Sequence, residues 1–119
     1  MSQQKQILDY ASKQYGASPE YLWEKYPTFA ILRHSNAHNK WFALTGRIAK
    51  RKLGLNEEGD TDFLNIKCPP EMVGMLRKDS NFLPAYHMNK EHWLTIVLDN
   101  GVATDELLKL LDWSFDLTK

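Results

Sequence analysis

The sequence predicts an α+β domain, a five-stranded antiparallel sheet with helices packed on it in the order α-β-β-β-α-β-β-α. Segments with helical periodicity lie near both ends of the chain, each with a start or stop signal. Runs of β-forming residues come in consecutive pairs separated by short turn clusters, which favours hairpins. The 119 residues, 43% of them hydrophobic, are the size of one ordinary domain. We therefore expect a single domain over residues 1–119.

The N-terminal segment predicts a first helix that ends near Gly16, because glycine is a common C-terminal stop. Its apolar residues recur at helical spacing, at Ile7, Leu8, Ala11 and Tyr15. Residues 17–27 then favour a short second helix or a turn. Ser18 is a candidate N-cap, Pro19 suits the first helical position, and Pro27 prevents continuation.

Three strands are expected in the next part of the chain. Residues 29–34 and 40–50 are rich in β-formers, and the turn cluster at 35–39 between them predicts a hairpin. Residues 51–61 form a polar loop with two glycines. Residues 62–68 alternate in the manner of a third strand.

Two further helices are predicted. Residues 69–80 begin with prolines suited to a first helical turn, although Gly74 costs this helix about 1 kcal/mol relative to alanine. Near the C-terminus, Thr104 is the expected cap, and Asp105 and Glu106 favour the positive end of the helix dipole. The expected buried stripe of this helix consists of Leu107, Leu108, Leu111 and Phe115.

A second hairpin is predicted from residues 85–88 and 92–99, with His87 directly opposite His92. Residues opposite one another on antiparallel strands have Cβ atoms about 5 Å apart, so both imidazoles could approach one ion. Zinc, however, needs four ligands, or three and a water, and no neighbouring residue in the sequence supplies them. The spacing also differs from the His-Glu-x-x-His helix motif. We therefore expect structural histidines and no bound metal.

Charge is segregated along a chain whose net charge is zero. Residues 25–56 contain no acid and carry a formal charge of +7, and the acids of residues 57–62 follow directly. From Asp99 to the C-terminus, five acids face two lysines. A dipolar surface of this kind bears on partners and steering rather than on fold.

The sequence also bears on the cellular compartment of the protein and on familiar catalytic motifs. A single cysteine, no apolar signal region and no run near the roughly 20 residues of a membrane-spanning helix predict a cytoplasmic protein without membrane association. Cys68, before two prolines, is expected to be a buried thiol rather than a nucleophile. Glu57 and Glu58 lie in a polar loop and are expected to be solvated. The sequence contains neither phosphate-loop nor dinucleotide spacing.

The basic run that includes Arg47, Lys50, Arg51 and Lys52 is the better candidate site. Together with Lys40 upstream, these side chains could contact phosphates from a strand end and a loop. The alternative is a solvated strand edge, where lysines discourage pairing between sheets. The tryptophans are more often core anchors than stacking platforms, although Trp41 and Trp93 could serve either purpose.

Four strings resemble the MmcQ/YjbR family: "KWFAL", "DFLNIKC" followed by proline, "LPAYHMNKEHWLTIVLD" and "ELLKLLDWSFDLT". The resemblance covers about residues 26–118. It implies the same element order in a small CyaY-like or secretion-chaperone-like α+β fold of "double wing" type, which is often described as DNA-binding. It brings no enzymatic activity and no cofactor. The hairpin string is the most recognisable part of the family pattern.

From this resemblance we expect weak, largely sequence-independent binding of double-stranded DNA through the basic 40–52 segment. The expected contacts are Lys40, Arg47, Lys50, Arg51 and Lys52, with Lys67, Asn89, Lys90 and His92 at the same rim. Alternatively, Asn89 supplies the unusual backbone angles of a turn. Two other functions stay open. One is a protein-interaction module that uses the sheet face or edge, and the other is an enzyme with an unrecognised site.

Overall fold

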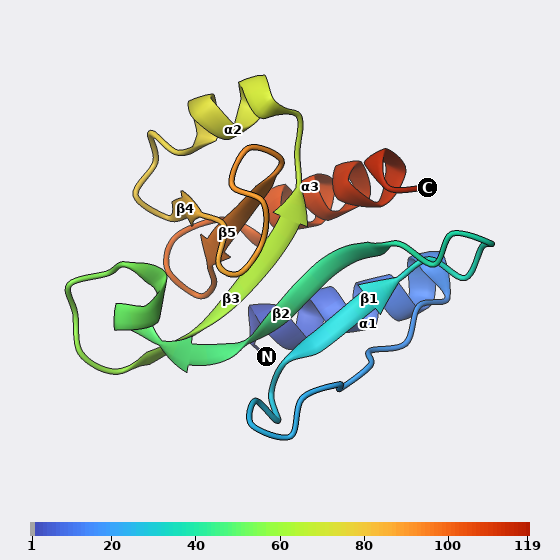
Figure 1. The fold of residues 1–119 in the computed structure, drawn as a ribbon, viewed down its shortest axis with the longest axis horizontal. Coiled ribbons are helices and arrows are strands. Elements are labelled where there is room, and N and C mark those ends of the chain that lie inside the picture. Colours follow the sequence, from blue (N-terminus) through green and yellow to red (C-terminus); the bar gives the residue numbers. More distant parts are fainter. Residues whose placement is uncertain (1) are drawn as a thin grey trace.

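A five-stranded antiparallel sheet organises the chain, which a computed structural model describes from residue 2 to residue 119 (Figure 1). The predicted order of helices and strands is confirmed. The elements are α1 (Gln3–Tyr15), β1 (Ala30–Arg33), β2 (Trp41–Ala49), the 3-10 helix η1 (Lys50–Leu53), β3 (Asp60–Lys67), α2 (Pro70–Leu76), β4 (Phe82–Pro84), β5 (Trp93–Val97) and α3 (Thr104–Leu117). Within residues 2–119, no helix is long and apolar enough to span a membrane.

The strands lie in the order β1-β2-β3-β5-β4, and every neighbouring pair is antiparallel. The predicted hairpin β1–β2 is confirmed, with an irregularity in its register between Leu32 and Arg33. The long pair β2–β3 runs from Ala43 opposite Ile66 to Ala49 opposite Asp60. This pair forms the middle of the sheet and fixes which side chains share a face.

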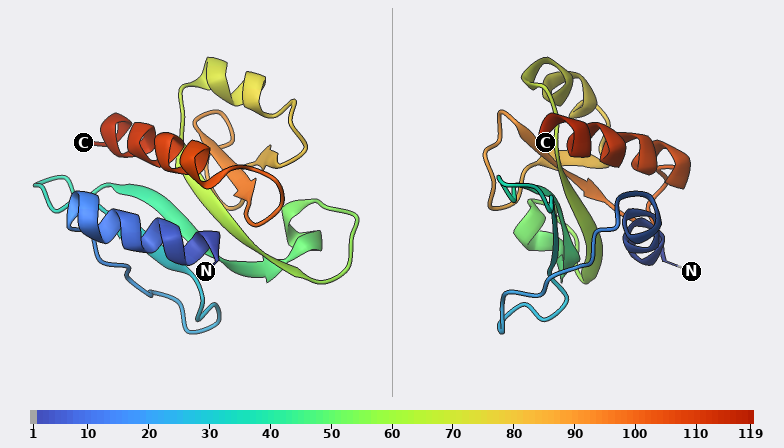
Figure 2. Two further views of the ribbon diagram at one scale, coloured as in Figure 1. Left: turned by 180° about the vertical axis from the view of Figure 1, so that it is seen from behind. Right: turned by 90° about the vertical axis from the view of Figure 1, so that its right-hand side faces the viewer.

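Helices α1 and α3 cover one face of the sheet (Figure 2). Helix α1 begins at Ser2, whose Oγ accepts a hydrogen bond from the Lys5 N–H at 3.2 Å. It ends at Gly16, which adopts the left-handed conformation as expected for a glycine stop. The core on this face includes Ile7, Ala11, Leu32, Phe42, Leu64, Ile66, Leu94, Ile96, Leu107, Leu110 and Leu111.

The opposite face, which we call the helix-free face, is covered by two irregular segments, residues 17–29 and residues 85–92 (Figures 1 and 2). Its strands contribute Ile31, Leu44, Ile48 and Phe63 to a second apolar cluster, together with Phe29 and Leu53 from outside the strands. Partly buried Trp23, Tyr26, Trp41, Leu55, Leu83 and Tyr86 pack against this cluster. Aromatic side chains and the short 3-10 helix η1, rather than an α-helix, therefore shield this side of the sheet, and "helix-free" refers to α-helices.

Two local predictions are settled at the helix ends. Of the two alternatives for residues 17–27, a short helix or a turn, the helix does not form, because the backbone of Glu20 pairs with that of Ile31 and extends the sheet edge instead. Helix α3 begins after Ala103, so Thr104 is its first residue and not its cap. The Thr104 hydroxyl instead accepts a 3.2 Å hydrogen bond from the Gln3 side chain, which ties the starts of α1 and α3 together.

The second hairpin exists, but its first strand lies earlier than expected. Strand β4 consists of Phe82–Pro84, with Pro84 opposite Leu94, whereas residues 85–88 were predicted to form this strand. Proline has no N–H to continue the ladder, and the chain leaves the sheet after it. Residues 85–92 therefore form an eight-residue loop between β4 and β5.

Candidate functional site

The loop at residues 85–92 is tied to the helix-free face through the backbone of Tyr86. The Tyr86 N–H donates to Thr95 Oγ1 at 2.8 Å, and the Tyr86 carbonyl accepts from Asn65 Nδ2 at 2.9 Å. Thr95 Oγ1 in turn donates to Asn65 Oδ1 at 2.5 Å. Because Asn65 and Thr95 are fully buried in neighbouring strands, the start of the loop is held over the middle of the sheet.

The far end of the loop is held by Asn89. Its Oδ1 accepts from the Glu91 N–H at 2.8 Å, and its carbonyl accepts from the Trp93 N–H at 3.0 Å. The His92 carbonyl accepts from the Cys68 N–H at 2.8 Å, which joins the loop to the end of β3. Asn89 thus has a structural role here. The left-handed backbone, which we considered for Asn89, occurs at His87 with φ 59°.

The predicted pairing of His87 and His92 across two strands is wrong. Both residues lie in the loop, where His87 is exposed and contacts the ring of Tyr86 at 4.1 Å between centroids, and His92 is half-buried. The hydrogen bonds to Asn65 and Thr95 draw Tyr86 away from an extended path, and this prevents the pairing. In the described part of the chain, no group of three or more His, Cys, Asp or Glu side chains is placed to hold a metal ion.

The predicted basic segment does not form one continuous patch. Arg47 lies 3.1 Å from an Asp62 carboxylate oxygen, and Lys50 Nζ lies 3.8 Å from Glu57. The acids that follow the basic segment in sequence thus fold back against it. Lys40 precedes β2, whereas Lys50 follows it, so these two lysines lie at opposite ends of a nine-residue strand. Surface pairs of this kind contribute about 0–1 kcal/mol, but they partly neutralise the charge offered to a phosphate.

Four other basic residues of the predicted site have no ion-pair partner among residues 2–119: Arg51, Lys52, Lys67 and Lys90. Arg51 and Lys52 are exposed on η1, which buried Leu53 anchors to the sheet. Lys52 Nζ lies 5.9 Å from the centroid of the Tyr26 ring, within the range of a cation–π contact.

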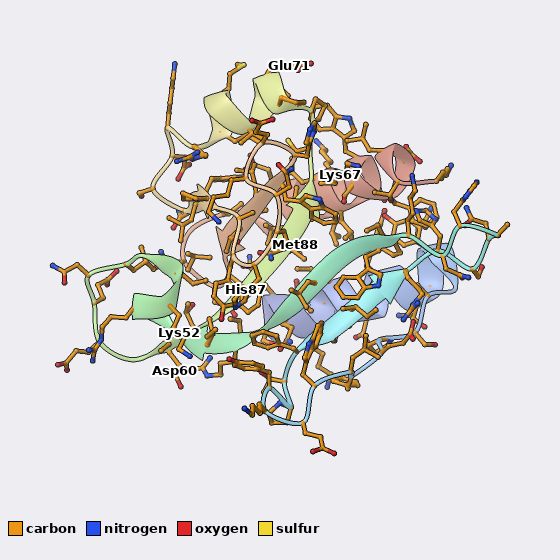
Figure 3. The ribbon with its side chains drawn as sticks, in the orientation of Figure 1. Lys52, Asp60, Lys67, Glu71, His87 and Met88 are labelled. Atoms are coloured by element: carbon orange, nitrogen blue, oxygen red, sulfur yellow. The ribbon has the colours of Figure 1, made fainter. Side chains whose placement is uncertain are left out.

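Lys67 and Lys90 add two more positive charges to the helix-free face. Lys67 is the cross-strand partner of Trp93, and both side chains share the face of Asn65 and Thr95 because strand residues alternate. Lys90 is exposed in the loop. In Figure 3, Met88 and His87 lie between Lys67 and Lys52 along the direction of β3.

Half-buried aromatic rings accompany these lysines. Tyr86 packs edge-on against Phe63 and Phe29, with ring centroids 5.9 and 6.4 Å apart. Burial raises the pKa of the Tyr86 phenol, and the nearby Tyr26 adds to the rise. Trp41 packs edge-on against Trp23 at 5.8 Å. Tyr86, Trp41 and Trp23 are each partly exposed, and Lys52 contacts the ring of Tyr26, so this face offers both π surfaces and a cation, a combination suited to stacking on nucleic-acid bases.

Cys68 is buried as predicted, at the end of β3. Burial raises the pKa of its thiol, and the charge of Glu71 raises it further. A thiol with a raised pKa is a poor nucleophile at neutral pH. The roles of Asn65, Thr95 and Tyr86 were missed by the sequence analysis. The available signal was a single asparagine among the apolar residues of β3, a position where a buried amide needs partners.

The chain is similar to a family of known proteins. The family model described as YjbR matches residues 12–117. The uncharacterized protein YyaQ of Bacillus subtilis (strain 168) is 47% identical over 113 residues, which cover 95% of each chain. The uncharacterized protein YjbR of Escherichia coli (strain K12) is 28% identical over 82 residues, 67% of this chain and 70% of that protein.

Solved structures show the same fold. A crystal structure of a Pseudomonas syringae protein superposes with a TM-score of 0.91 at 43% identity and covers 97% of each chain. A crystal structure of a Deinococcus radiodurans protein gives a TM-score of 0.69 at 22% identity, covering 96% of this chain and 74% of that one. The second match supports the architecture alone.

Proposed function

The chain belongs to the YjbR family, and from the chemistry of its helix-free face we propose that it is a non-enzymatic domain that binds DNA weakly and with little sequence preference. The observation that carries the proposal is that Lys52 and Lys67 lie near the two ends of β3 and Lys90 lies in the loop at residues 85–92, on a face that also carries half-buried aromatic rings. None of the three lysines has an ion-pair partner within residues 2–119. Lysine side chains contact the phosphates of nucleic acids, and unpaired bases stack on aromatic rings.

The proposed contact surface differs from the basic segment expected from sequence. Arg47 and Lys50 already have acid partners, so we assign them a smaller share of the contact. Lys40 lies just before β2, at the end of the sheet that also holds Lys67 because Ala43 pairs with Ile66, and it remains a peripheral contributor. Arg51 remains a peripheral contributor, because it is exposed on η1 beside Lys52.

The charge of the opposite face of the sheet also favours DNA binding on the helix-free face. Helices α1 and α3 pack on the opposite face and together carry five acids, Asp9, Asp105, Glu106, Asp112 and Asp116, against three lysines, Lys5, Lys13 and Lys109. A polyanion is repelled from that side and steered toward the helix-free face. The net charge of zero keeps the overall attraction weak.

The affinity follows from the number of contacts. Non-specific DNA binding at physiological salt has dissociation constants of roughly 10⁻⁴ to 10⁻⁶ M, and three phosphate contacts belong at the weak end. Each contact contributes about −0.9 to the slope of log affinity against log salt for duplex DNA, and about −0.7 for single strands. Three lysines therefore give a slope of about −2 to −3.

The experiment compares two triple variants with the same change in net charge. Lys52→Gln/Lys67→Gln/Lys90→Gln removes the proposed contacts. The matched control, Lys5→Gln/Lys13→Gln/Lys109→Gln, removes three exposed lysines from helices α1 and α3. Labelled duplex and the corresponding single strand are titrated at several salt concentrations by fluorescence anisotropy.

We expect the helix-free-face variant to lose most of the salt dependence and the control to keep the wild-type slope. Tighter binding of the single strand than of the duplex would show that the aromatic rings take part. If the wild-type protein fails to bind at low salt, or if both variants bind alike, the DNA proposal fails.

A protein partner is the second candidate, because two apolar side chains are exposed beside the first strand. Tyr21 and Leu22 are 58% and 50% exposed. The sheet edges are less suitable, since Glu20 occupies the outer side of β1 and β4 is a three-residue strand that ends in Pro84. Loss of a co-purifying protein in Tyr21→Ser/Leu22→Ser, but not in Met75→Ser on α2, would support this function.

A further inference from the structure

A cavity of about 650 Å³ lies at the end of the hairpin formed by β1 and β2. The C-terminal ends of α1 and α3 lie near the turn of this hairpin (Figure 2). We call this cavity the hairpin-end cavity, and its lining includes Tyr15, Arg33, His34 and Phe115. Its volume lies within the roughly 300–1,000 Å³ typical of small-molecule sites. These residues come from three separate parts of the sequence, so the cavity exists only in the folded chain.

Aromatic rings form the apolar part of the hairpin-end cavity. The rings of Tyr15 and Phe115 are stacked, with centroids 4.1 Å apart and planes 6° from parallel. His34 contacts Phe115 at 4.3 Å between centroids. Because Tyr15 and Phe115 are only half-buried, part of their surface is available to a planar ligand.

Arg33 supplies a charged group whose orientation is already fixed. Its Nε donates to Glu20 Oε2 at 2.7 Å, and the side chain remains 32% exposed. The charge of Arg33 is thus paired with Glu20, while neither terminal nitrogen of the guanidinium donates a hydrogen bond within residues 2–119. A guanidinium held at Nε presents these two nitrogens as a fork, which matches the two oxygens of a carboxylate.

His34 is buried in the wall of the cavity, and the charged residues that line the cavity are Glu20, Arg33 and Lys119, whose Nζ lies 5.4 Å from the centroid of the Phe115 ring. The Thr118 hydroxyl lies 2.8 Å from both the Ser114 carbonyl and His34 Nε2, so when its proton goes to the carbonyl it accepts from Nε2. This pattern fits the neutral imidazole with its proton on Nε2. In that form His34 shapes the wall of the cavity without adding a further cation.

The negative ends of the helices at this cavity are partly capped. In α1, the Gly16 N–H donates to the Ser12 carbonyl at 3.1 Å, and the Ala17 N–H donates to the Ala11 carbonyl at 3.2 Å. These carbonyl oxygens would otherwise disfavour an anion. Lys119, at the cavity rim, pairs with Asp116 at 3.2 Å.

We propose that the hairpin-end cavity binds a small aromatic carboxylate, with the carboxylate on the outer nitrogens of Arg33 and the ring against Phe115. The site lies at the opposite end of β2 from η1 and uses none of the three lysines assigned to DNA. It is therefore a second binding site, independent of the proposed function.

The test is an NMR titration of the ¹⁵N-labelled protein with benzoate, benzamide, benzylamine, acetate and inorganic phosphate. Benzoate is expected to shift the amide signals of Gly16, Ala17, Ser35 and Asn36 in a saturable manner, with millimolar affinity. Benzamide lacks the charge and acetate lacks the ring, so each should bind at least about tenfold more weakly. Benzylamine, a cation, should leave these signals unchanged.

Variants separate the charge from the ring. Arg33→Gln should abolish benzoate binding, and Arg33→Lys, which keeps the charge and loses the fork, should weaken it. Phe115→Leu should reduce the preference for benzoate over acetate. Arg77→Gln, after α2 and outside the cavity lining, is the control and should bind as the wild type does. A ¹⁵N spectrum of each variant establishes that it is folded.

Four results would overturn the proposal. The first is equal binding of benzoate and benzamide. The second is unchanged benzoate binding in a folded Arg33→Gln variant. The third is phosphate binding as tight as that of benzoate, which would remove the aromatic requirement. Shifts confined to residues outside the cavity would likewise place the ligand elsewhere.

Discussion

Asn65 and Thr95 are cross-strand partners on β3 and β5, and their fully buried side chains share a 2.5 Å hydrogen bond. Together they bond both the N–H and the carbonyl of Tyr86. The two polar side chains in the middle of the sheet therefore have partners, as buried polar groups need. Their bonds also hold the loop that carries His87 and Lys90.

Asn65→Ala should destabilise the protein by about 1–3 kcal/mol, because the buried Thr95 hydroxyl and the partly buried Tyr86 carbonyl each lose a partner. Urea unfolding measures the change, and faster hydrogen exchange at the Tyr86 amide would show that the loop is released. Asn56→Ala, at an exposed position, is the control and should stay within about 0.5 kcal/mol of the wild type. Equal effects of the two substitutions would contradict a structural role for the buried pair.

Leu111→Ala tests the docking of α3 on the sheet. Leu111 is 0% exposed, and its truncation should cost about 2–5 kcal/mol. Leu117→Ala, in the same helix at 41% exposure, should cost about 0.5 kcal/mol or less. A loss below about 0.5 kcal/mol for Leu111→Ala would mean that α3 is peripheral to the core.

Local signals in the sequence predicted most of the fold. The spacing of Ile7 and Ala11 with the stop at Gly16 gave α1, and the turn between β1 and β2 gave their hairpin. Such patterns act over a few residues and need no tertiary partner. Leu110 was missed in the buried stripe of α3, although it is buried with Leu107 and Leu111.

The candidate site was predicted less well, because its geometry depends on distant partners. Residues 85–88 have β-forming character, yet Asn65, twenty-one residues before Tyr86, draws them out of the sheet. Likewise, Arg47 and Lys50 read as free charges until the following loop folds back and supplies their acid partners. Tertiary context overrides local propensity at both places.

Gly46→Ala should destabilise the helix-free face. A Cβ at Gly46 would lie 2.5 Å from Phe29 Cδ1 and 3.1 Å from Phe29 Cα, so both the ring and its backbone would have to shift. Overpacking of this kind costs about 1–3 kcal/mol. Gly74→Ala, on the exposed side of α2 with no atom within 4 Å of the new Cβ, should instead stabilise by about 0.5–1 kcal/mol. Thermal unfolding of both variants checks the opposite signs, and a neutral Gly46→Ala would show that Phe29 is loosely packed.

The stability of the fold should depend on the protonation of His34. Burial lowers the pKa of His34 below its ordinary value of 6.5, and the charge of Lys119 lowers it further, while the Phe115 backbone and Asp116 oppose the shift. In the unfolded chain the imidazole binds a proton near pH 6.5, before the folded protein does. The contribution of neutral His34 is therefore complete above pH 6.5 and declines as the pH falls toward the lowered folded-state pKa.

His34→Gln should remove this part of the pH dependence, because glutamine does not titrate and its amide can still donate to Thr118. The measurement is the free energy of unfolding in urea from about pH 8 to about pH 5, where stability rises with pH if the unfolded state binds more protons. The variant should show a shallower loss of stability on acidification than the wild type, whatever its stability at neutral pH. His38→Gln, in the exposed turn between β1 and β2, is the matched control substitution. Parallel slopes for the wild type and His34→Gln would mean that His34 protonates as readily in the folded chain as in the unfolded one, and the assignment of a buried neutral imidazole donating to Thr118 would then be wrong.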